Sequence, residues 1–188
     1  MLLAAAWTLA IPAFGQSGES EQGEVSARAG VAWGGGTSSM GTQPAVAGSA
    51  GVAFSRYGMI LLDVSFIPLG QHTIQGWPVR SSVNRSYLLD FGVDFHIRIP
   101  IKDRVAPYAI VGTGLLWDMV RQSTVTAAGS SIVNHYSQFN GALHTGGGVR
   151  YYIGELWGIR PEIKVIVSKQ IYTNISCGVF YNLPAGWP

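Results

Sequence analysis

The chain has 188 residues, of which 12% are charged, whereas soluble domains average about 25% charged residues. Its net charge is +2 without a basic cluster, which argues against nucleic-acid binding, and the single cysteine, Cys177, excludes an intramolecular disulfide. Its apolar residues occur in runs too short for a spanning helix of roughly 20 residues, so this hydrophobic composition indicates a closed membrane β-barrel.

The chain starts with an apolar stretch, MLLAAAWTLAIPAFG at positions 1–15, that ends before the polar segment QSGESEQGE. This length and the small residues Ala13 and Gly15 predict a signal peptide that is cleaved after Gly15. A buried N-terminal helix is the alternative. Residues 16–23 are polar and contain glycine and serine, which predicts a flexible periplasmic leader on the mature chain.

From residue 24 to residue 183 the side chains alternate between apolar and polar or small, which is the period of a β-strand with two different surroundings. In the clearest example, 87–98, Phe91 and Phe95 fall on one face and Asp90 and Asp94 on the other. The other predicted strands lie at 25–33, 46–54, 60–66, 105–118, 140–152, 159–167 and 171–183. Eight strands are therefore expected, followed by a C-terminal tail at 184–188.

The predicted connections between these strands alternate in length. Long connections are expected at 34–44, 69–85 and 119–136, and short ones at 55–58, 99–104, 154–157 and near Lys169. Bacterial barrels have long extracellular loops and short periplasmic turns, so this alternation predicts an all-β, eight-stranded, antiparallel transmembrane β-barrel in the outer membrane. An even number of strands would place both termini on the periplasmic side.

Aromatic residues fall near both ends of the predicted strands, and aromatic rings prefer the interfaces of a membrane. We expect an extracellular girdle of Trp33, Phe66, Tyr87, Trp117 and Phe139, and a periplasmic girdle of Phe54, Phe95, Tyr151, Trp157 and Tyr181. Cys177 falls on the same face as the aliphatic residues, so we expect it to face lipid and to be inert.

The opposite faces of the strands carry a sparse, nearly neutral set of charges. A soluble lipocalin-like barrel, the alternative, would display these charges on its exterior, where they are too few to favour solubility. In a membrane barrel they fill the interior, where buried charges must be paired. The predicted interior network is Arg28, Asp63, Asp90, Asp94, His96, Arg98, His144, Arg150, Arg160, Glu162 and Lys164. We expect His96 and His144 to form hydrogen bonds rather than bind a metal, and we expect no cofactor.

Three segments carry a family resemblance: VAPYAIVGTGLLW, GGGVRYYIGELWGIRPEIKV and the closing GVFYNL. They resemble the small outer-membrane β-barrel family that includes OmpX and the membrane domain of OmpA. The resemblance covers nearly all of residues 24–183. It implies a barrel surrounded by outer-membrane lipid and lipopolysaccharide, and we expect a monomer.

The leading functional hypothesis is a structural or surface-interaction protein, in which the barrel anchors extracellular loops that contact a ligand. A narrow, porin-like channel is the second hypothesis. The third is a lipid-modifying enzyme, because His135-Tyr136-Ser137 resembles the H-x-S motif of the PagL lipid A deacylases. A histidine two residues from a serine on one strand lies on the same face and can act as its general base. Asp118 is the candidate for the orienting carboxylate, and we expect no enzymatic activity.

Overall fold

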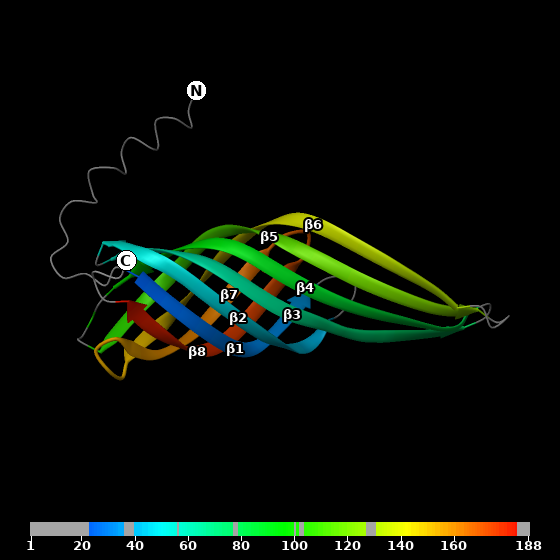
Figure 1. Cartoon of the computed structure of the whole chain (residues 1–188), viewed down its shortest axis with the longest axis horizontal. Coiled ribbons are helices and arrows are strands. Elements are labelled where there is room, and N and C mark those ends of the chain that lie inside the picture. The colour runs from blue at the N-terminus through cyan, green and yellow to red at the C-terminus, as the bar shows by residue number, and fades with distance from the viewer. Residues whose placement is uncertain are drawn as a thin grey trace, which may run out of the picture.

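The computed structural model describes residues 23–35, 40–55, 57–76, 79–99, 101, 104–126 and 131–183. The strands are β1 (Gly23–Gly35), β2 (Met40–Ser55), β3 (Gly58–Gly76), β4 (Val79–Arg98), β5 (Val105–Thr126), β6 (Ser131–Tyr152), β7 (Trp157–Val167) and β8 (Ile171–Leu183). They form one closed antiparallel barrel in chain order, in which β1 also pairs with β8 (Figure 1). The predicted fold, an eight-stranded antiparallel barrel, is confirmed.

The two ends of the barrel differ in their connections. Gly23 is the backbone partner of Leu183, so both ends of the described strands meet at one rim, which we call the terminal end. The opposite rim, where β3 connects to β4 and β5 to β6, is called the hairpin end. The predicted signal peptide at 1–15, residues 16–22 of the predicted leader and the tail at 184–188 lie outside the described residues. Among the described residues, no helix is long and apolar enough to cross a membrane.

The alternation in the sequence separates two faces of the barrel wall. Large aliphatic side chains point outward, and Leu62, Val111 and Leu143 are 62%, 58% and 64% exposed. Charged side chains point inward, and Arg150 and Arg160 are fully buried. A soluble lipocalin-like barrel requires the reverse arrangement, so the structure does not fit that alternative.

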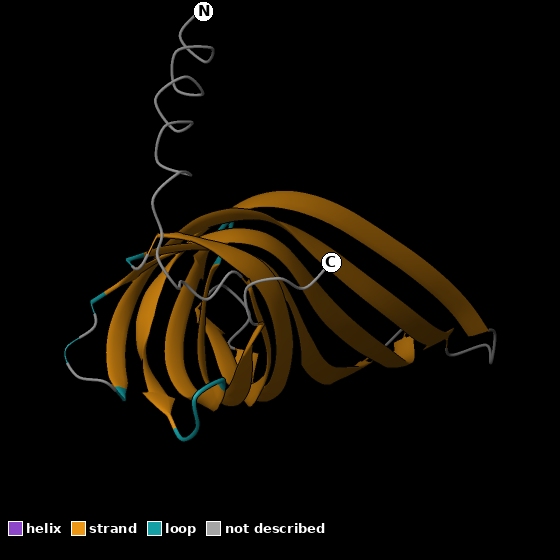
Figure 2. Ribbon diagram, turned by 60° about the vertical axis from the view of Figure 1, so that its left-hand side comes forward, coloured by secondary structure: helices purple, strands orange, loops and turns teal. Residues whose placement is uncertain are grey.

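The strands have unequal lengths, which makes one side of the barrel much taller. β1 has 13 residues, whereas β5 and β6 have 22 each. The tall strands rise beyond the rest of the barrel as a curved wall at the hairpin end (Figure 2). Strand pairing continues to Gly76 and Val79 in the β3–β4 hairpin, and to Val125 and Ser131 in the β5–β6 hairpin.

The prediction of long irregular loops at 69–85 and 119–136 is therefore wrong, because most of these residues form paired strands. The predicted loop at 34–44 is also too long, since β1 continues to Gly35 and β2 begins at Met40. The polar residues in these segments do not alternate with apolar ones. Backbone hydrogen bonds nevertheless pair the strands, and the threonines and valines there favour extended conformations.

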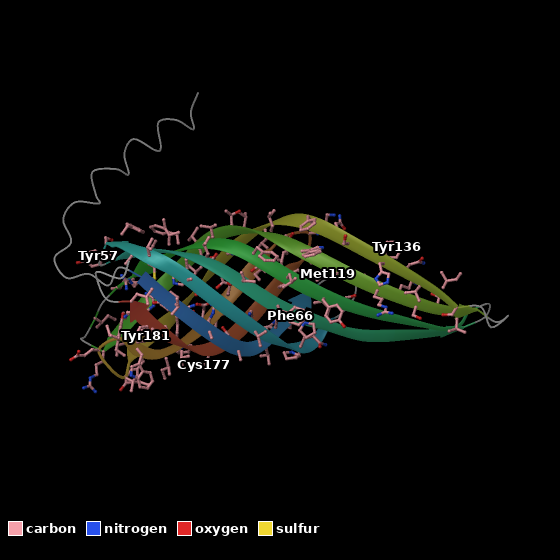
Figure 3. All side chains as sticks on the ribbon, viewed as in Figure 1. Tyr57, Phe66, Met119, Tyr136, Cys177 and Tyr181 are labelled. Atoms are coloured by element: carbon pink, nitrogen blue, oxygen red, sulfur yellow. The ribbon has the colours of Figure 1, made fainter. Side chains whose placement is uncertain are left out.

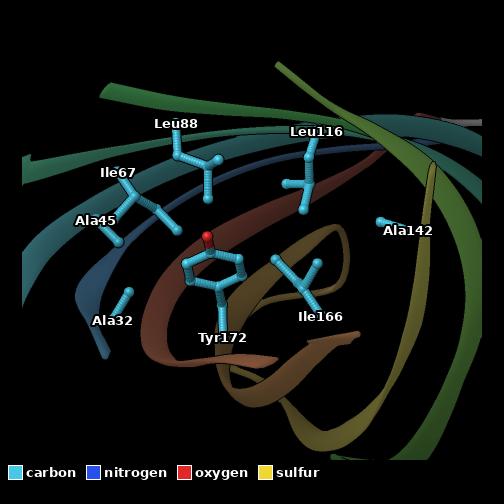
Figure 4. Close-up of a cluster of buried hydrophobic side chains, with 8 residues drawn as sticks. All are labelled: Ala32, Ala45, Ile67, Leu88, Leu116, Ala142, Ile166 and Tyr172. Carbon is cyan, nitrogen blue, oxygen red and sulfur yellow. The ribbon is translucent and has the colours of Figure 1, made fainter. Parts of the chain in front are cut away.

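An apolar layer closes the barrel interior below the hairpin end (Figure 4). Each of the eight strands contributes one buried residue to it, and the members are Ala32, Ala45, Ile67, Leu88, Leu116, Ala142, Ile166 and Tyr172. Alanines on three strands leave room for the larger side chains of the others. The layer separates the hairpin end from the charged interior.

Candidate functional site

The interior charges begin near the terminal end with one carboxylate that holds two arginines. Glu24 is fully buried, and its Oε1 accepts hydrogen bonds from Arg160 Nη1 at 2.6 Å and Arg150 Nη2 at 3.1 Å. Arg160 Nη2 also donates to Ser49 Oγ at 3.2 Å. The arginine from β6 and the arginine from β7 are therefore both tied to β1, which helps to hold the barrel closed.

The middle of the interior is organised around Arg28. Its guanidinium forms ion pairs with Asp63 and with Glu162, which come from β3 and β7. Tyr108 Oη donates to the other oxygen of Glu162 at 2.7 Å. A planar guanidinium suits such a position, because it presents several N–H donors in a fixed geometry.

The third group of charges lies toward the apolar layer. Lys164 Nζ is 2.8 Å from Asp94 Oδ2, 3.3 Å from Asp63 Oδ1 and 3.5 Å from Asp90 Oδ2. His144 bridges the two β4 carboxylates, with Nδ1 2.7 Å from Asp94 Oδ1 and Nε2 3.1 Å from Asp90 Oδ1. Carboxylates accept at both ring nitrogens, and only the imidazolium donates from both.

These three groups join into one continuous network across five strands. Its carboxylates are Glu24, Asp63, Asp90, Asp94 and Glu162, and its cationic groups are Arg28, Arg150, Arg160, Lys164 and His144. When His144 is protonated, the number of cationic groups in the network equals the number of carboxylates. Balance matters here because an unpaired charge in a buried site is strongly destabilising.

Two predicted network residues have other surroundings. His96 is buried and stacks on Tyr108, with ring centroids 4.7 Å apart and an interplanar angle of 9°. Arg98 is buried, and its Nη2 donates to the Ser55 carbonyl at 3.2 Å. His96 and His144 therefore have different neighbours. Within the described part of the chain, no group of three or more His, Cys, Asp or Glu residues is arranged to hold a metal ion.

The sequence reasoning missed two members of the interior. Glu24 is the first residue of the predicted barrel and is absent from the predicted interior network, although it alternates in register with Ser26 and Arg28. Tyr108 falls in the predicted strand 105–118, but the predicted interior network does not include it. The alternation was enough to find Glu24, whereas the contact between Tyr108 and Glu162 depends on which strands are brought together.

Glycines create the space for the His144 ring. A Cβ atom at Gly92 or at Gly114 would overlap this ring. Both residues lie on strands next to or near β6, at positions where a side chain would otherwise fill the narrow interior. Glycine at such positions allows a close approach of side chain to backbone.

The outward aromatic residues form stacked pairs toward the two ends of the wall. Trp117 stacks on Phe139 and Phe66 on Tyr87 at the hairpin end, with ring centroids 5.2 Å and 5.9 Å apart. Phe54 stacks on Phe95 near the terminal end at 5.2 Å. Other predicted girdle residues are also exposed, and these are Trp33, Tyr151, Trp157 and Tyr181. Cys177 is exposed on the same outer surface (Figure 3).

The H-x-S motif lies on the outer face of the β5–β6 hairpin. Ser137 is the backbone partner of Met119, and His135 is the partner of Arg121. Asp118 pairs with Gln138, so it lies on the opposite face of the sheet. Asp118 therefore cannot orient His135, and the proposed catalytic arrangement is not formed.

A closed barrel with paired charges inside and aliphatic side chains outside satisfies its backbone and presents an apolar surface, which defines a membrane-spanning β-barrel. Comparisons with known proteins lead to the same class. The family model described as the outer membrane protein beta-barrel domain matches residues 1–182. A search of curated protein sequences found no match.

Three solved structures illustrate the similarity in fold. Neisserial surface protein A is 17% identical, with 89% of this chain and 100% of that chain covered and a TM-score of 0.60. Ail, the attachment invasion locus protein of Yersinia pestis, is 12% identical, with 86% and 99% covered and a TM-score of 0.55. A major outer membrane protein from Thermus thermophilus is 10% identical, with 86% and 99% covered and a TM-score of 0.56. The chain belongs to the outer membrane protein beta-barrel domain family and resides in the bacterial outer membrane.

Proposed function

We propose that this chain is a surface protein whose barrel anchors two tall hairpins outside the cell, where they bind a polyanionic ligand. The observation that carries the proposal is the continuation of β3–β4 and β5–β6 as paired strands beyond the stacked Trp117 and Phe139. This region stands beyond the stacked aromatic pairs and exposes both faces of β6, with Tyr136 on one face and Ser137 on the other. Tyr136 is labelled in Figure 3.

The orientation of the barrel follows from the unequal ends. Outer-membrane barrels have short periplasmic turns and longer extracellular segments. The hairpin end is therefore assigned to the outside, and both termini to the periplasm. We expect a monomer whose apolar belt is surrounded by outer-membrane lipid and lipopolysaccharide.

The charges of the hairpins favour an anionic ligand. Segments 69–86 and 119–140 contain three arginines and two histidines but no Asp or Glu. Arg121 is the backbone partner of both Arg85 and His135, and Arg121 and His135 are exposed. A bound anion would be attracted to the exposed guanidinium of Arg121, and salt would screen this attraction. A structure of Ail, with a TM-score of 0.51, contains the heparin analogue sucrose octasulfate, which supports the same ligand class.

The filled interior makes a channel the weaker hypothesis. The apolar layer crosses the barrel with one residue from each strand, and the charge network lies behind it. Ions would have to pass both the apolar layer and the charge network. Planar-bilayer recording tests this point, since a steady open-state conductance of the purified protein would contradict the role of a closed anchor.

Retention on immobilised heparin tests ligand binding. The purified protein in detergent micelles should be retained at low salt, and the double variant Arg121→Gln, His135→Gln should elute at clearly lower salt because the hairpin loses the guanidinium of Arg121 and the imidazole of His135. Arg104→Gln is the matched control, since Arg104 is exposed in the β4–β5 connection at the terminal end. Equal shifts for the control and the double variant would mean that only net charge is sensed, and would overturn the assignment to the hairpins.

A further inference from the structure

A cavity of about 140 Å³ opens at the mouth of the barrel, on the inner side of the tall wall. Leu88, Leu116 and Tyr172 line it and also belong to the apolar layer, so this layer forms its floor (Figure 4). The other lining residues are polar and come from β5, β6 and the short β7–β8 connection. The cavity is separate from Arg121 and His135, which lie on the outer face of the wall.

One acceptor in this cavity lacks a partner. Asp118 lines it, and the Oδ1 atom of Asp118 is buried with no hydrogen-bond partner in the described part of the chain. Two other lining groups are already engaged, since Ser168 Oγ donates to the Gly141 carbonyl at 2.7 Å and Tyr172 Oη donates to Gln170 Oε1 at 3.3 Å. A buried acceptor without a donor carries a desolvation cost, so a ligand that supplies a hydroxyl or N–H group would be stabilised there.

The charges of the lining select against charged ligands. Asp118 and Lys169 both line the cavity and carry opposite charges. A small cation would meet Lys169, and a small anion would meet Asp118. A neutral ligand with several hydroxyl groups avoids both repulsions and can use the amides of Gln138 and Asn140, which donate and accept.

The size of the cavity limits the ligand to one ring. Its volume is about 140 Å³, and a cavity on the order of 150 Å³ in another protein holds the six-membered ring of benzene. Because this cavity is open at the mouth of the barrel, the substituents of a larger ring can project out of it. An apolar floor with polar walls suits a ring whose faces are less polar than its edge. A pyranose has this form, with hydroxyl groups around a six-membered ring.

We propose that this cavity binds one neutral pyranose unit of an extracellular glycan. Asp118 and Asn140 hydrogen-bond to its hydroxyl groups, and the ring lies above Leu116 and Tyr172. The extracellular source rests on the proposed orientation of the hairpin end. Binding to the cavity does not depend on this orientation, because it is measured on the purified protein. It is also independent of retention on heparin.

Titration with neutral methyl pyranosides tests the proposal. The protein is refolded in a detergent without a sugar head group, and methyl glucoside, galactoside, mannoside and N-acetylglucosaminide are titrated by NMR. We expect at least one of them to bind and to shift the side-chain amide signal of Asn140. Lysine methyl ester and inorganic phosphate serve as the cationic and anionic probes, and neither should bind.

Two variants and one control locate the site. Asn140→Leu replaces the amide with an apolar side chain, and Asp118→Leu removes the carboxylate acceptor; each should weaken binding by about tenfold, the loss expected from roughly one hydrogen bond. Ser137→Ala on the outer face should bind like the parent protein. A band shift on boiling in a cold denaturing gel verifies that each variant is folded. Failure of all four pyranosides to bind, equal binding to Asn140→Leu, or preference for a charged probe would each overturn the proposal, even if heparin retention is intact.

Discussion

Strands β5 and β6 have different surroundings in the barrel body and in the projecting hairpin. In the body, Leu116 and Ala142 face the apolar layer while Val111 and Leu143 are exposed on the outer surface. In the hairpin, the β6 residues from Ser131 to Phe139 are exposed on both faces. The body is therefore held by side-chain contacts as well as backbone pairing, whereas the hairpin depends mainly on backbone pairing. Substitutions should be costly in the first region and tolerated in the second.

The largest effect is expected from Glu24→Ala in the charged interior. This change removes the carboxylate that Arg150 and Arg160 share, and breaking a buried ion pair costs about 3–5 kcal/mol. The free energy of unfolding, measured by urea denaturation in micelles, should fall by that amount. Glu155→Ala is the control, because Glu155 is exposed in the β6–β7 turn. Equal unfolding midpoints for both variants would show that the network does not stabilise the barrel.

A smaller effect is expected from Ile166→Val in the apolar layer. Ile166 is fully buried, so loss of one methylene should lower the free energy of unfolding by about 0.5–1.5 kcal/mol. Ile163→Val on the same strand provides the comparison, since Ile163 is 50% exposed on the outer face. The interior variant should unfold at a lower urea concentration in the same micelles. A larger loss of unfolding free energy for Ile163→Val than for Ile166→Val would mean that contacts with the detergent or lipid outweigh packing in the layer.

The smallest effect is expected from Ser137→Ala in the hairpin. The side chain is exposed, so the free energy of unfolding should change by less than about 0.5 kcal/mol. The same variant examines the H-x-S motif. Lipid A from cells that express the parent protein or the variant should give identical mass spectra, because Asp118 lies on the other face and cannot orient His135. A lipid A species that requires Ser137 would reinstate the enzymatic hypothesis.

The comparison of the two regions also explains where sequence reasoning succeeded. In the body, a residue such as Asp94 meets the interior and its neighbour Phe95 is exposed, so the two surroundings appear as a period of two. In the hairpin, polar residues such as Gln138 and Ser137 follow one another because both faces meet solvent. The extended backbone of the hairpin therefore leaves no alternation in the sequence, and the sequence pattern predicts a loop there.

The apolar layer shows a second limit on what the sequence can predict. Leu88 and Ile166 alternate in register with the predicted interior residues Asp90 and Lys164, yet the predicted interior is a charged network throughout. Inspection of one strand does not reveal that all eight strands place an apolar or small residue at the same level. That level depends on the stagger between strands, and the same stagger determines that Asp118 and Lys169 meet at one cavity.

The sequence by itself determined that the chain is a membrane barrel, which face of most strands points inward, and that both signs of charge are enclosed. These properties follow from alternation along a single strand, which is local. Only the tertiary structure decided that Glu24 holds Arg150 and Arg160, that His144 bridges Asp90 and Asp94, and that the interior is divided into a charged and an apolar part. Each of these contacts joins residues far apart in the chain, and closure with one particular register brings them together.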